Sequence, residues 1–144
     1  ILEDDAVFSS KISSEYLNDL ITIMKTNRIA LLQIGFIEPL YRYDTLGNLS
    51  SLKNSSVLKQ SGKKERITWG QFRAGAHAYL LSREGAGVLE AGSTCSLIPL
   101  DGQLDNLARY YRSSPHFRVG RLFKSQVHQA SRKSKEVQLD SDVS

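Results

Sequence analysis

The chain has 144 residues, a length that suits one domain and is too short for two. Charged residues make up 24% of it and hydrophobic residues 40%, which is a composition typical of globular proteins. No run approaches the roughly 20 apolar residues that a transmembrane helix needs. The single cysteine, Cys95, excludes an internal disulfide and a cysteine-based zinc site, and the net charge is +4.

Residues 1–7 place three consecutive carboxylates, Glu3, Asp4 and Asp5, directly after two branched apolar residues. A short apolar run that ends in acid predicts a buried strand whose carboxyl end meets a site. Three adjacent anions repel one another, and a divalent cation such as Mg²⁺ or Mn²⁺ would relieve that repulsion. The alternative is a charged turn after an edge strand. Because the chain begins within this strand, and with Ile, we expect it to be the later part of a longer protein or a truncated gene product.

Residues 14–25 carry apolar side chains at helical spacing, and Ser13 before them is a suitable N-cap. We therefore predict a helix with one buried face. Residues 29–37 are nearly all apolar and predict a central strand covered on both faces. The order of strand, helix and strand predicts an α/β unit with a parallel pairing.

Residues 41–66 follow neither the helical nor the strand period. A loop of this length is usually functional or disordered. Tyr41, Arg42 and Tyr43 at its start could face a sugar or a nucleotide. For residues 50–64 the expectation is a mobile surface excursion.

Two short strands are predicted next, one over residues 67–72 and an apolar one over residues 75–82. The second contains His77, for which two interpretations stay open. It is either a metal ligand or a hydrogen-bonded strand residue, and the strand by itself favours the second.

A helix is predicted over residues 83–91, with Ser82 as its N-cap and Gly92 at its end. Gly85 and Gly87 within it are poor helix formers. Their presence indicates close packing against a neighbour.

A further helix is predicted over residues 102–111, and Asp101 before it is placed to act as its N-cap. The alternative is a carboxylate held at the mouth of a site. Residues 117–123 alternate like a final strand. Residues 125–144 are polar and are expected to form a flexible tail. Since residues 118–135 contain six Lys or Arg and no acid, this tail could favour an anionic surface.

Three segments stand in a characteristic order: Leu-Glu-Asp-Asp at 2–5, Gly-Ala-His-Ala-Tyr-Leu-Leu-Ser at 75–82 and Pro-Leu-Asp at 99–101. This order resembles glycosyltransferase family 25, which includes lipopolysaccharide-modifying glycosyltransferases of bacteria and collagen galactosyltransferases of animals. Gln126 and Ser131 loosely match a closing Gln and Ser of that family. The resemblance covers residues 1 to about 131 and lacks the family's first half, which holds the nucleotide base.

The resemblance implies an α/β fold of the GT-A type, present in part. It implies inverting transfer of a sugar, for example galactose, from a UDP-sugar to a saccharide or glycoconjugate such as lipopolysaccharide. It further implies Mn²⁺ or Mg²⁺ as cofactor, no nucleic-acid partner, and a cytoplasmic location at the inner face of the membrane. Without the first half, we do not expect full activity from this chain alone.

The same resemblance assigns roles to six residues of the motifs. Glu3, Asp5 and His77 would hold the metal, Asp4 and Tyr79 would bind the donor, and Asp101 would be the catalytic base that deprotonates the acceptor hydroxyl. Two other classes stay open: a non-catalytic remnant that binds a glycan or a protein partner, and a metal-dependent phosphotransferase or hydrolase.

Overall fold

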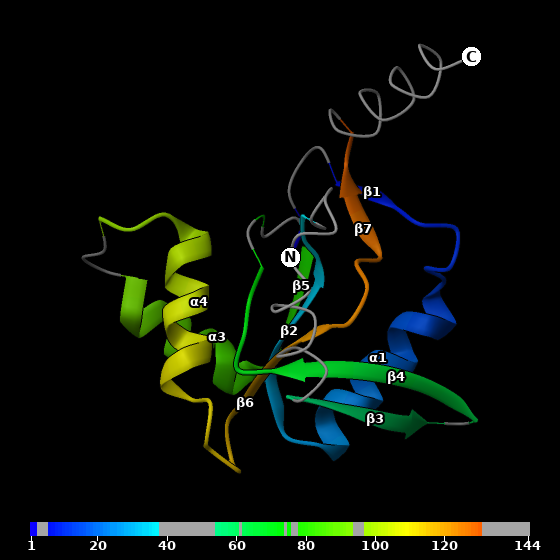
Figure 1. The fold of residues 1–144 in the computed structure, drawn as a ribbon, viewed down its shortest axis with the longest axis horizontal. Coiled ribbons are helices and arrows are strands. Elements are labelled where there is room, and N and C mark those ends of the chain that lie inside the picture. The colour runs from blue at the N-terminus through cyan, green and yellow to red at the C-terminus, as the bar shows by residue number, and fades with distance from the viewer. Residues whose placement is uncertain are drawn as a thin grey trace.

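The computed structural model describes residues 1–2, 6–37, 54–60, 62–73, 75, 78–93 and 97–130. This part of the chain forms a mixed α/β fold, in which an open sheet of parallel and antiparallel strands is flanked by helices (Figure 1). The predicted α/β class is confirmed. Glu3, Asp4, Asp5, His77 and residues 41–53 lie outside the described residues.

Helix α1, Ser14–Thr26, and strand β2, Ile29–Gly35, form where the apolar pattern predicts them. The Ser13 hydroxyl accepts a hydrogen bond of 3.1 Å from the backbone N–H of Tyr16, so the predicted N-cap is confirmed. Every residue of β2 is buried, as expected for a central strand with both faces covered.

The described residues form one seven-stranded sheet in the order β1-β7-β2-β6-β4-β3, with β5 also paired to β2. Strands β6 and β7 run parallel to β2, whereas the other pairings are antiparallel. The remaining strands are β1, Ala6–Phe8; β3, Ser55–Gln60; β4, Lys63–Trp69; β5, Ala78–Leu81; β6, Arg118–Leu122; and β7, Val127–Gln129.

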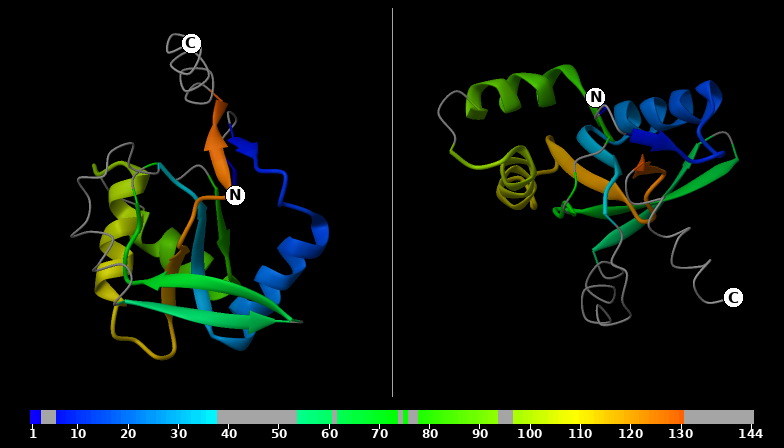
Figure 2. Two further views of the ribbon diagram at one scale, coloured as in Figure 1. Left: turned by 45° about the vertical axis from the view of Figure 1, so that its right-hand side comes forward. Right: turned by 90° about the horizontal axis from the view of Figure 1, so that it is seen from above.

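Helix α1 packs on one face of the sheet, and helices α3, Arg83–Ser93, and α4, Leu100–Tyr110, pack on the other (Figures 1 and 2). Successive residues of a strand point to opposite faces. Accordingly, Leu32 joins the core beneath α1, while Leu31 joins a second core cluster beneath α4.

The strand expected within residues 1–7 is not where it was predicted. Ile1 and Leu2 are 62% and 51% exposed, and Leu2 makes an isolated antiparallel bridge with Ala78 of β5. The strand of this region, β1, follows the acids and pairs with β7 at the edge of the sheet. The predicted parallel pairing of this strand with β2 is therefore wrong, because the parallel partners of β2 are β6 and β7.

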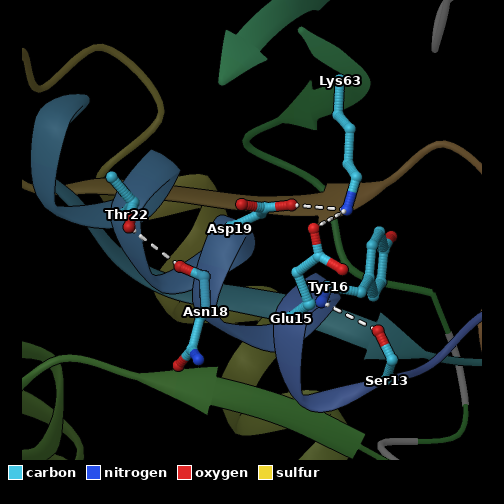
Figure 3. A network of polar contacts seen from close by, with 7 residues as sticks. All are labelled: Ser13, Glu15, Tyr16, Asn18, Asp19, Thr22 and Lys63. Atoms are coloured by element: carbon cyan, nitrogen blue, oxygen red, sulfur yellow. Dashed lines mark hydrogen bonds and ion pairs between the residues drawn. The ribbon is translucent and has the colours of Figure 1, made fainter. Parts of the chain in front are cut away.

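The expected surface excursion over residues 50–64 is wrong from residue 55 on, since β3 and β4 form an antiparallel hairpin. Gly62 at the turn has φ +82°, a conformation that glycine adopts readily. Lys63 then reaches α1, with its Nζ 2.9 Å from Asp19 and 3.3 Å from Glu15 (Figure 3). These ion pairs raise the pKa of Lys63 and fasten the hairpin to the helix.

The beginning of α3 confirms two predictions and corrects two others. The Ser82 hydroxyl accepts a hydrogen bond of 3.0 Å from the Gly85 N–H, as an N-cap does. A Cβ on Gly85 would lie 2.2 Å from the Ala30 carbonyl oxygen, so close packing is confirmed there. A Cβ on Gly87 would meet nothing within 4 Å, and the helix continues past Gly92 to Ser93.

The prediction places the start of the flexible polar tail, at residue 125, too early in the chain. Strand β7 lies within it, and Val127 is fully buried against the core. Ser125 fastens this segment, because its Oγ accepts from the Phe36 N–H at 3.0 Å and donates to the Val127 carbonyl at 2.7 Å. Residues 131–144 lie outside the described residues.

Candidate active site at the carboxyl end of β2

The candidate site lies where β2 ends and β5 begins. We call Gln33, Arg73, Gly75 and Asp101 the β2-end cluster. Gln33 comes from the carboxyl-terminal half of β2, Arg73 and Gly75 from the connection that leads into β5, and Asp101 from the first turn of α4. Carboxyl ends of parallel strands are where ligands bind in open α/β sheets.

Gln33 is a fully buried amide in an otherwise apolar strand, and its hydrogen bonds explain its presence. Its Nε2 donates to the Arg73 carbonyl at 2.9 Å and to the Gly75 carbonyl at 3.2 Å, while its Oε1 accepts from the Arg73 N–H at 3.0 Å. A buried side-chain amide is stable only when its polar atoms are bonded. Gln33 therefore fixes the backbone of Arg73 and of Gly75 against β2.

Asp101 completes the cluster from the opposite side. Its Oδ2 accepts a hydrogen bond of 2.8 Å from the backbone N–H of Gly75. The predicted N-cap role is wrong: α4 begins at Leu100, its N-cap is Pro99, and no side chain caps it. The carboxylate instead joins α4 to the segment that enters β5.

Tyr79 lies in β5 and is 3% exposed. Its side chain belongs to the core cluster that contains Leu31, Leu104 and Val119. Its backbone N–H donates to the Ile1 carbonyl at 3.1 Å, and its carbonyl accepts from the Ile1 amino group at 2.9 Å. The structure thus gives Tyr79 a packing role, and the donor contact stays a prediction.

The predicted metal ligands lie outside the described residues, but their neighbours in the chain are described. Leu2 precedes the three acids and Ala78 follows His77, and these two residues form the isolated bridge at the edge of β5. Within the described ranges, no three His, Cys, Asp or Glu side chains are grouped so that they could hold a metal ion. The metal site stays a prediction.

Arg121 is a residue of this region that the sequence analysis missed. It is opposite Gln33 in the parallel pairing of β2 with β6, and it is only 2% exposed. Its Nη1 donates to the Leu122 carbonyl at 3.1 Å, and its guanidinium lies 5.2 Å from the centre of the Phe36 ring. Residues 119–122 of β6 are all buried, so both faces of this strand are covered and Arg121 is enclosed among them.

The structure therefore brings Asp101 and the entry of β5 together, and it adds Gln33 and Arg121 to the same end of the sheet. Among the described residues, no helix combines the length and the apolar character that crossing a bilayer would require. No protein-family model, no curated protein and no solved structure matches the chain.

Proposed function

We propose that this protein is a metal-dependent glycosyltransferase of the family 25 type with a GT-A-like fold. It would move a sugar from a UDP-sugar to a saccharide or glycoconjugate acceptor. The observation that carries the proposal is the bond from the Gly75 N–H to Asp101, at 2.8 Å. This bond joins the motif segment 75–82 to the motif segment 99–101. The bridge between Leu2 and Ala78 joins the motif segment 2–5 to the segment 75–82.

The chemistry needs a base and positive charge beside the leaving diphosphate. Inverting transfer requires a carboxylate that removes the proton of the acceptor hydroxyl as it attacks. Asp101 would supply that carboxylate, and the bond from the Gly75 N–H to its Oδ2 holds it beside the start of β5. Arg121, which is buried at the same end of the sheet, would add positive charge there.

A bound Mn²⁺ or Mg²⁺ would neutralise the diphosphate as a Lewis acid. The predicted ligands are Glu3, Asp5 and His77, and this set of two carboxylates and one imidazole is chemically suited to Mn²⁺. The proposal includes a cytoplasmic location at the inner face of the membrane, as the resemblance implies.

The test compares Asp101→Asn with Asp105→Asn, a matched change one turn later on α4. Asp105 pairs with Arg109 at 2.8 Å on the helix surface, so it lies outside the cluster. We expect Asp101→Asn to lower sugar transfer by at least about 100-fold, which is the usual contribution of a general base. Asp105→Asn should retain transfer.

Transfer is measured with a panel of UDP-sugars and saccharide acceptors in the presence of Mn²⁺, with melting temperatures recorded for both variants. In Asp101→Asn the amide oxygen of the new side chain can still accept from Gly75, so the fold should be kept. Equal transfer by both folded variants would remove Asp101 from the mechanism. Phosphate release without sugar transfer would favour a hydrolase in place of a glycosyltransferase.

A further inference from the structure

A cavity lies at the opposite end of β2 from the β2-end cluster. Its volume is about 840 Å³, which is within the range of small-molecule sites. It is lined by the end of α1, the start of β2, the end of β5, the start of α3 and the residues before β6. Its apolar wall consists of Ile21, Met24, Ile29, Leu80, Leu81 and Phe117.

Basic side chains from separate elements line the same cavity. They are Lys25 in the last turn of α1, Arg28 before β2, Arg83 at the start of α3, and His116. Within the described part of the chain, no ion pair joins Lys25, Arg28 or Arg83 to an acid. Because α3 begins here, its N-terminal dipole adds to the positive potential.

The acid in this lining is Glu84, which is exposed and carries one negative charge against the three positive charges of Lys25, Arg28 and Arg83. Hydrogen bonds from its own backbone N–H and from the Ser82 hydroxyl, together with the nearby Arg83 guanidinium, lower the pKa of its carboxyl. The Nη1 of Arg28 lies 2.8 Å from Nδ1 of His116. Since a guanidinium can only donate, this ring nitrogen is the acceptor.

The backbone of Arg28 supports a role for its side chain. Arg28 has φ 56°. Among the described residues, no other residue apart from glycine has a positive φ. Glycine adopts this conformation at lower cost than any residue with a Cβ. An arginine kept in a strained position beside a cavity is a reason to test that side chain for binding.

We propose that this cavity binds an amphipathic anion, with an apolar chain against the wall and an anionic head group at the basic rim. A purely apolar ligand would make no ionic contact with the basic side chains. A small hydrophilic anion would leave the apolar wall exposed to water. The inference is independent of the proposed glycosyltransferase activity, because it uses residues at the other end of the sheet.

The first experiment titrates the protein with decyl phosphate below its micelle concentration by isothermal calorimetry. Decanol and inorganic phosphate serve as the two partial ligands. We expect saturable 1:1 binding of decyl phosphate that is at least tenfold tighter than the binding of either partial ligand. Equal binding of decanol, equal binding of inorganic phosphate, or no binding of decyl phosphate would each overturn the proposal.

The second experiment assigns the binding to this cavity. Arg83→Gln and Arg28→Gly should each weaken decyl phosphate about tenfold, the usual effect of removing one charged hydrogen-bonding group. Arg109→Gln is the matched control, because it removes the same charge from the exposed surface of α4. Arg28→Gly should also melt no lower than the original protein, since it relieves the positive φ. Equal affinity in all three variants would place the ligand elsewhere.

Discussion

Gln33 offers a direct test of how the candidate site is held together. In Gln33→Met, three hydrogen bonds to Arg73 and Gly75 are lost, while a side chain of similar length remains. Each bond contributes about 0.5–1.5 kcal/mol net, and the extra apolar burial of Met offsets about 1 kcal/mol. We therefore expect the free energy of unfolding to fall by about 2 kcal/mol.

Urea denaturation measures that loss, and hydrogen exchange locates it. The Arg73 amide donates to Gln33 Oε1, so its protection should fall about tenfold or more in the variant. Gln103→Met is the matched control, because Gln103 makes one exposed bond of 2.7 Å to the Ile98 carbonyl. That variant should stay within about 0.5 kcal/mol. Unchanged protection of Arg73 in Gln33→Met would show that Gln33 does not hold this segment.

Further predictions concern α3 and α1. Gly85→Ala should destabilise the protein by about 1–3 kcal/mol, because its Cβ would meet the Ala30 carbonyl. In Gly87→Ala the Cβ meets nothing within 4 Å, so urea denaturation should show a gain of about 0.5–1 kcal/mol; the reverse order would contradict the packing. Burial raises the pKa of Tyr16 above its ordinary value of 10.0, and the nearby Glu65 carboxylate raises it further, by a smaller amount. The unfolded chain loses this proton first, so stability is full below pH 10 and falls as the pH rises further. Tyr16→Phe should show a smaller fall above pH 10, and an equal fall in both proteins would exclude Tyr16 as its source.

The elements with a regular apolar pattern were predictable from the sequence. The N-cap at Ser13 and the apolar side chains at helical spacing after it located α1. The continuous apolar run of β2 identified the central strand. Ser82 likewise marked the start of α3. These features depend on residues a few positions apart, so local periodicity and capping are sufficient to specify them.

The hairpin of β3 and β4 was missed because its sequence carries no clear period. β4 opens with Lys-Lys-Glu-Arg, and β3 alternates only between exposed and partly exposed residues. Such strands are stabilised by their partners rather than by their own composition. The partner of β1 was mistaken for the same reason, since pairing with β7 joins residues from opposite ends of the chain.

The candidate site shows the same division between local and tertiary information. From the sequence, Asp101 could be a cap or a site carboxylate, and no role was assigned to Gln33. Apolar patterning and capping act over a few residues, so α1, β2 and the start of α3 could be located without knowing their partners. The tertiary structure decided that Gln33 and Asp101 both bind the backbone of Gly75, because such contacts exist only after distant segments have packed together.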